Sequence, residues 1–139
     1  MVDIHIGYLG ELHCEAKHGP SQRTLETDAP LDNHGRGQSF SPTDLVATAL
    51  GTCMATVMGI KARSRGFDLD GMNIHVKKLM TAAPPRRIAR LEVAVRVPAD
   101  VTQRVQDGRG ELEHAANTCP VRLSLLDAID VPVAFEWQT

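Results

Sequence analysis

The sequence predicts an α+β protein in which antiparallel sheets pack around one long buried helix. Residues 45–60 contain no charged side chain, which is typical of a helix enclosed by protein rather than lying on a surface. Apolar and polar residues alternate at 2–16, 72–77 and 88–97, a pattern typical of half-buried strands. We therefore expect a single domain over residues 1–139, which is long enough to bury about two thirds of its unfolded surface.

The N-terminal part is expected to form a strand, a hairpin and a loop. The strand covers residues 2–16, and the turn cluster at 18–21 predicts a hairpin into a second strand at 22–27. Residues 28–40 are rich in Gly, Pro, Asn and Asp, so they form a loop that leads directly to the start of the helix. Loops in such positions often line functional sites.

Local signals mark both ends of the central helix. Ser41 is expected to cap it, Pro42 suits its first position, and Asp44 completes a short capping box. Gly66 is expected to stop the helix in a left-handed conformation. Because a bilayer needs about 20 apolar residues and charged residues bracket a shorter span, we expect a core helix and no membrane partner.

The second half of the chain is expected to add strands and helices. These are strands at 72–77 and 88–97, a helix from Asp100 or Thr102 to Asn117, a short helix at 120–128 and a strand at 131–137. In the strand at 88–97, alternate apolar side chains form the face that covers the helix; they are Leu91, Val93, Val95 and Val97. Gly108 and Gly110 weaken the longer helix by about 1 kcal/mol each. Pro132 favours an edge position for the last strand.

Charge and composition exclude several classes of partner. The 15 basic and 17 acidic residues give a net charge of -2, which favours neither nucleic acid nor an anionic membrane. The N-terminus has no basic segment followed by an apolar run, so we expect a cytoplasmic protein. Thiols in that compartment usually stay reduced.

Three cysteines are the candidate chemical groups. An odd number argues against a disulfide framework and for one working pair, or none. Cys53 lies in the middle of the long helix and needs a nearby cation to be acidic; otherwise it is an inert core residue. Cys119 precedes Pro120, so it is expected to cap the last helix and to be the more acidic thiol. Cys14, on the first strand, is expected to be structural.

A metal site is the least favoured interpretation of the cysteines. Cys53, Cys119 and His114 are the candidate ligands, but closely spaced pairs such as C-x-x-C are absent. We therefore expect no metal and no cofactor. Gly51 and Gly59 predict that another backbone approaches the helix closely, either a second copy of the helix in a dimer or the covering sheet.

Two motifs together resemble the OsmC/Ohr family of osmotically inducible and organic hydroperoxide resistance proteins. They are Ser41-Pro42-Thr43-Asp44-Leu45 leading to Gly51-Thr52-Cys53, and Ala115-Ala116-Asn117-Thr118-Cys119-Pro120-Val121. The resemblance covers nearly the whole chain. It implies an OsmC-like fold, an intertwined homodimer with two interfacial sites, and thiol-dependent reduction of organic hydroperoxides in oxidative or osmotic stress. It also implies that Cys53 attacks the peroxide, that Cys119 resolves the product as a disulfide, and that an external dithiol reduces it.

The resemblance departs from the peroxidase pattern at two places. Peroxidase members carry a Glu directly after the Pro that begins the helix, where this chain has Thr43; Asp44 lies on the opposite helix face from Cys53. Those members also use an arginine of the N-terminal hairpin, and here Arg23 or Arg36 is left to supply the positive charge. The alternative is therefore a non-catalytic OsmC-like dimer that binds or senses small apolar ligands.

Overall fold

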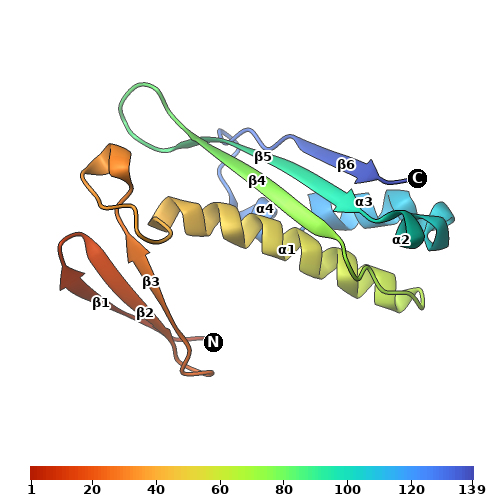
Figure 1. Cartoon of the computed structure of the whole chain (residues 1–139), viewed down its shortest axis with the longest axis horizontal. Coiled ribbons are helices and arrows are strands. Elements are labelled where there is room, and N and C mark those ends of the chain that lie inside the picture. The colour runs from red at the N-terminus through yellow and green to blue at the C-terminus, as the bar shows by residue number, and fades with distance from the viewer. The chain divides into compact units, whose positions relative to one another are not determined.

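The structure, a computed structural model, describes the backbone of residues 1–139 and every side chain except that of Gln106. The chain divides into two compact units, Met1–Val46 and Ala47–Thr139. Each unit contains one three-stranded sheet, and helix α1 (Pro42–Ser64) begins in the first unit and continues through the second (Figure 1). The α+β class is as predicted.

Three antiparallel strands form the sheet of the N-terminal unit in the order β1-β2-β3. They are β1 (Ile4–Gly10), β2 (His13–His18) and β3 (Thr24–Asp28). The single strand predicted over 2–16 is wrong, because the chain turns at Glu11 and Leu12, whose φ angles are 53° and 60°. Non-glycine residues rarely adopt positive φ, and the usual Asn-Gly or Asp-Gly signal is missing here. The hairpin before β3 is confirmed.

The loop after β3 is tied to its own ends. It contains one short 3-10 helix, η1 (Leu31–Asn33). The backbone N–H of Asp28 donates to the carbonyl of Phe40 at 3.0 Å, and the N–H of Gln38 donates to the buried Asp28 carboxylate at 3.0 Å. The predicted loop over 28–40 is therefore confirmed, and it delivers the chain to α1 in a fixed path.

The predicted start and stop of α1 are both confirmed. Ser41 Oγ accepts the N–H of Asp44 at 3.1 Å, and the Asp44 carboxylate accepts the N–H of Ser41 at 2.8 Å. Gly66 has a φ of 86°, and the N–H of Phe67 donates back to the Ala62 carbonyl at 3.3 Å. The helix is 23 residues long.

This length exceeds that of the uncharged span, residues 45–60, on which the expectation of a core helix rests. By length and composition α1 is the one helix among the described residues that is long and apolar enough to cross a bilayer, a test that core helices of soluble proteins also pass. In the single chain one face of α1 is buried, formed by Ala47, Leu50, Gly51, Met54, Met58 and Ala62. The opposite face is uncharged but exposed, so the single chain encloses the helix on one side only.

The second sheet covers the buried face of α1. It has the order β4-β5-β6, with strands β4 (Asn73–Met80), β5 (Ile88–Val97) and β6 (Val133–Trp137) (Figure 1). The predicted inward residues of β5 are at most 3% exposed; they are Leu91, Val93, Val95 and Val97. β6 lies at the edge as predicted, although it pairs with β5 in parallel. The helical segments between these strands allow this crossover.

Four short helical segments connect β5 to β6. They are α2 (Ala99–Arg104), η2 (Gln106–Gly108), α3 (Arg109–Asn117) and α4 (Pro120–Ser124). The single helix predicted up to Asn117 is wrong, because the chain breaks around the buried Val105, close to the weakening Gly108. The last helix also ends earlier than predicted, with Leu125 in an extended conformation.

Candidate functional site

Cys53 lies half-buried on α1, two residues after Gly51, where this helix packs closely against the sheet. A Cβ atom at Gly51 would come within 3.1 Å of Val76 Cγ2 and 3.6 Å of Ile74 Cγ2 on β4. Gly51 therefore serves packing on the covering sheet, one of the two predicted alternatives. A Cβ atom at Gly59 would meet nothing within 4 Å in the single chain.

Cys119 caps α4 as predicted. Its sulfur accepts the backbone N–H of Arg122 at 3.4 Å, Pro120 follows at the first helical position, and the Cys119 carbonyl accepts the N–H of Leu123 at 3.1 Å. Cys119 is completely buried. The local sequence thus fixes the direction of this thiol, while the packing around it removes it from water.

The structure brings the Cys53 and Cys119 thiols together. Burial raises the pKa of the Cys119 thiol above its ordinary value, and hydrogen bonding to Cys53 and the charge of that side chain raise the pKa further. The backbone N–H groups of Arg122 and Val121 lower the pKa, but by less than burial and Cys53 together raise it. Cys119 is thus not an acidic thiol. The prediction from its capping position is wrong, because desolvation outweighs the cap.

β6 and α3 hold the segment that carries Cys119. Trp137 Nε1 donates to Glu113 Oε1 at 2.8 Å, and the guanidinium of Arg109 lies over the Trp137 ring at 5.3 Å. Leu112 on α3 is completely buried. Because these contacts join α3 to the last strand, the turn that follows α3 begins from a fixed point.

Arg122 is the residue near the thiols that the sequence reasoning missed. Its Nη1 donates to Asn117 Oδ1 at 2.9 Å, across the turn that contains Cys119. Asn117 Nδ2 in turn donates to the Glu113 carbonyl at 3.0 Å. The sequence holds one signal for this contact, because Asn117 and Arg122 lie close to the Cys-Pro pair, one on each side of it.

The predicted arginines and Thr43 belong to the N-terminal unit. Arg23 and Arg36 both have exposed side chains, and their role toward the thiols stays a prediction. Thr43 Oγ1 lies 3.2 Å from Ser41 Oγ. With Asp44, it therefore takes part in the polar start of α1.

Cys14 and His114 occupy unremarkable positions. Cys14 is half-buried on β2, in register with Tyr8 and Thr27 on the flanking strands. His114 is exposed on α3, and its carbonyl accepts the hydroxyl of Thr118 at 2.8 Å. Among the residues that the structure describes, no three His, Cys, Asp or Glu side chains gather as a metal site.

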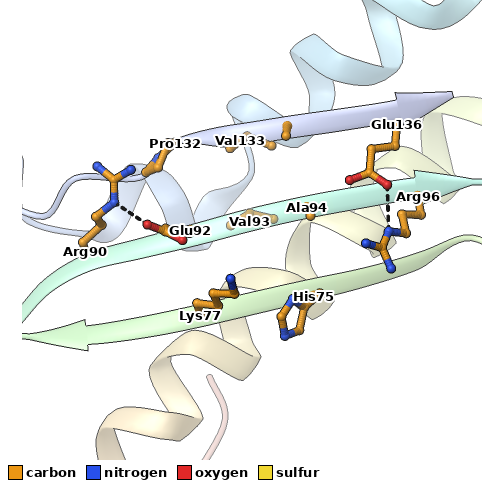
Figure 2. A pocket seen from close by; sticks show the side chains of 11 residues that line it. His75, Lys77, Arg90, Glu92, Val93, Ala94, Arg96, Pro132, Val133 and Glu136 are labelled. Carbon is orange, nitrogen blue, oxygen red and sulfur yellow. Dashed lines mark hydrogen bonds and ion pairs between the residues drawn. The ribbon is translucent and has the colours of Figure 1, made fainter.

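A hollow of about 470 Å³ lies on the other, polar face of the second sheet (Figure 2). Ala94 pairs with Ala134 at its floor, and these small side chains leave space between two cross-strand groups of charges. Arg96 pairs there with Glu136 at 2.7 Å, and Arg90 Nε pairs with Glu92 at 2.9 Å. This hollow has no cysteine in its lining, so it is separate from the thiol pair.

Comparison with known proteins finds a family model and solved structures that are similar to this chain. The family model described as OsmC-like protein matches residues 35–134, which include Cys53 and Cys119. A crystal structure of an osmotic stress induced and detoxification response protein from Psychrobacter arcticus is 38% identical. It has a TM-score of 0.87, and the alignment covers 98% of this chain and 96% of that one. No curated protein sequence matches this chain.

More distant structures share the fold. An organic hydroperoxide resistance protein of Vibrio cholerae, with captopril bound in one of its active sites, is 15% identical with a TM-score of 0.75. The alignment covers 99% of this chain and 92% of that one. The organic hydroperoxide resistance protein of Bacillus subtilis is 16% identical, with a TM-score of 0.69 and 98% of each chain covered. At these identities the likeness shows the fold alone.

Proposed function

This chain belongs to the OsmC-like protein family, and we propose that it is a thiol-dependent peroxidase that reduces organic hydroperoxides in oxidative or osmotic stress. The adjacent Cys53 and Cys119 thiols carry this proposal. The related structures support the substrate class, because one is described as a detoxification response protein and others as organic hydroperoxide resistance proteins. We place the protein in the cytoplasm, where dithiol reductants keep such a pair reduced.

The reaction has three steps. The Cys53 thiolate attacks one peroxide oxygen, so that a sulfur–oxygen bond forms and the O–O bond breaks. The departing alkoxide takes up the proton that the Cys53 thiol lost, so the products are the sulfenic acid and the alcohol. Cys119 then attacks the resulting sulfenic acid, so that a disulfide forms and water leaves. An external dithiol reduces this disulfide by exchange and restores both thiols. Arg23 or Arg36 supplies the positive charge that favours the Cys53 thiolate.

The homodimer is part of this proposal, and the exposed apolar face of the first sheet supports it. Ile4, Ile6 and Tyr8 are 60%, 70% and 66% exposed in the single chain. Exposed apolar patches of this kind mark surfaces that bind another protein. A second copy of the chain is the partner that an intertwined dimer provides.

The uncharged outer face of α1 supports the same dimer. Thr48, Thr52, Thr56 and Ile60 form an exposed stripe at intervals of four residues. The hydroxyl of Thr52 donates to the Thr48 carbonyl and that of Thr56 to the Thr52 carbonyl, each at 2.8 Å. The hydroxyls of Thr52 and Thr56 are thus hydrogen-bonded within the helix. The stripe can therefore be buried against another protein surface without leaving these hydroxyls unpaired. The two units would then act as one OsmC-like domain.

Replacement of Cys53 tests the function. In Cys53→Ser we expect consumption of cumene hydroperoxide, with a dithiol reductant, to fall to the background rate, because the attacking sulfur is gone. Cys14→Ser, the matched control in the other unit, keeps the parental rate. Unchanged peroxide consumption in Cys53→Ser would rule out the proposal.

A second candidate function is a non-catalytic dimer that binds or senses small apolar ligands. Thr43 favours it, because this hydroxyl stands where peroxidase members have a carboxylate and lies beside Ser41 at the helix start. Turnover of cumene hydroperoxide by the unmodified protein and a dithiol eliminates this alternative. Binding of the alcohol product without any turnover of the peroxide would favour it over the peroxidase.

A further inference from the structure

We propose that Arg122 and Asn117 form a clamp across the Cys119 turn that positions the Cys119 sulfur for disulfide closure. The proposal rests on the proposed function, because it concerns the second step of that reaction. It assigns a positioning role to two side chains outside the attacking cysteine.

The clamp spans both sides of the cysteine. Arg122 Nη1 donates to Asn117 Oδ1 at 2.9 Å, which links the first turn of α4 to the end of α3. Asn117 Nδ2 donates to the Glu113 carbonyl at 3.0 Å, which fixes the amide on α3. Between them lies Cys119, whose sulfur accepts the backbone N–H of Arg122 at 3.4 Å. One residue therefore holds the turn by its side chain and the sulfur by its backbone.

The partner of Arg122 distinguishes it from four other arginines of the second unit. Arg65, Arg90, Arg96 and Arg104 each pair with a carboxylate. Among the described residues, the half-buried Arg122 side chain has a neutral amide oxygen as its acceptor instead. A neutral acceptor gives less attraction than a carboxylate. We infer that this contact acts by holding the two side chains in position rather than by pairing opposite charges.

Disulfide closure makes strict geometric demands. The Cys119 sulfur must approach the Cys53 sulfenic acid so that the S–S bond forms as the S–O bond breaks. The proton of the Cys119 thiol joins the departing hydroxyl group, which leaves as water. Backbone N–H groups aimed at the Cys119 sulfur stabilise its developing negative charge. A loosened turn loses both the direction of the sulfur and these donors, while the Cys53 step does not use them.

A single-turnover experiment separates formation of the Cys53 sulfenic acid from closure of the disulfide. In a Cys14→Ser background the protein reacts with cumene hydroperoxide, dimedone traps the sulfenic acid, and intact mass reports the disulfide. In Arg122→Ala we expect sulfenic acid formation to keep its parental rate and closure to slow about tenfold, the effect of one lost charge-assisted hydrogen bond. Arg104→Ala is the matched control, since Arg104 Nη2 and Nε bind Asp100 within α2.

Further variants separate the clamp from general destabilisation. Asn117→Ala should slow closure as much as Arg122→Ala, and the double variant no more than either, because they remove one shared contact. Arg122→Lys should recover part of the rate, because an ammonium can still donate to Asn117. Unchanged closure in Arg122→Ala, or equal slowing of both steps, overturns the proposal.

A diamide experiment distinguishes failure of the clamp from failure of the proposed function. Diamide adds to one thiol and is displaced by the other, giving the disulfide and the reduced hydrazine without any peroxide. If cumene hydroperoxide produces no sulfenic acid, the peroxidase function fails. Diamide closure of the Cys53–Cys119 disulfide still tests the clamp, with about tenfold slowing in Arg122→Ala expected and an unchanged rate contradicting it.

Discussion

The Cys119 sulfur is subject to two opposing effects at the residue scale. Its position at the start of α4 gives it backbone N–H donors, which favour a thiolate. Its complete burial and its hydrogen bond to Cys53 favour the thiol, and these prevail. A protonated second cysteine suits the proposed reaction, because Cys119 then stays inactive until a sulfenic acid forms next to it.

This balance predicts a pH effect on stability. Because folding raises the pKa of Cys119, its contribution is fully present below the ordinary thiol pKa of about 8.5 and is lost as the pH rises through the folded value. Urea unfolding under reducing conditions should therefore show a fall in the free energy of unfolding above that pH. The fall should be smaller in Cys119→Ala. Equal pH dependence in both proteins would contradict the raised pKa.

At the scale of the element, α1 is held against β4 by the absence of a side chain at Gly51. A Cβ atom there would come within 3.1 Å of Val76 Cγ2, and the larger side chain of Val would reach further. Gly51→Val should therefore lower the free energy of unfolding by about 1–3 kcal/mol. Gly110→Ala on α3, where nothing lies within 4 Å, should raise it by up to about 1 kcal/mol.

Urea unfolding of both variants measures this difference. A stabilised or unchanged Gly51→Val protein would show that the sheet yields at this point and that α1 is not held there. The Gly110→Ala result checks that a helical glycine without close neighbours behaves as its propensity predicts.

Local sequence was sufficient for those elements whose signals are local. The Ser41–Asp44 capping box, the Gly66 stop and the alternation of β5 all specify their structure within a few residues, and each was predicted. The turn at Glu11 and Leu12 was missed because neither residue is a turn former. Its conformation is set by the pairing of β1 with β2.

The candidate site was predictable only in part. The two cysteines and the capping position of Cys119 follow from the Cys-Pro pattern and the family resemblance. The burial that raises the Cys119 pKa depends on residues far apart in the chain, so no local pattern reveals it. The Arg122–Asn117 contact depends on how α3 and α4 meet, which residue types alone do not specify.

At the scale of the whole molecule, the exposed apolar surfaces predict a homodimer. Ile60 on the α1 stripe is 65% exposed in the single chain, so Ile60→Lys costs little within one protomer but places a charge in the proposed interface. Sedimentation should show twice the mass of one chain for the parent and a shift of Ile60→Lys toward one chain. Leu79→Lys, 43% exposed on β4, is the control that should stay dimeric. A monomeric parent protein would contradict this assembly.

The thiol inventory after one equivalent of cumene hydroperoxide tests the redox pair most directly. We predict that peptide mapping without reduction finds Cys53 joined to Cys119 by a disulfide, with Cys14 still a free thiol. Three free thiols after the peroxide treatment, or a disulfide that includes Cys14, would contradict the account.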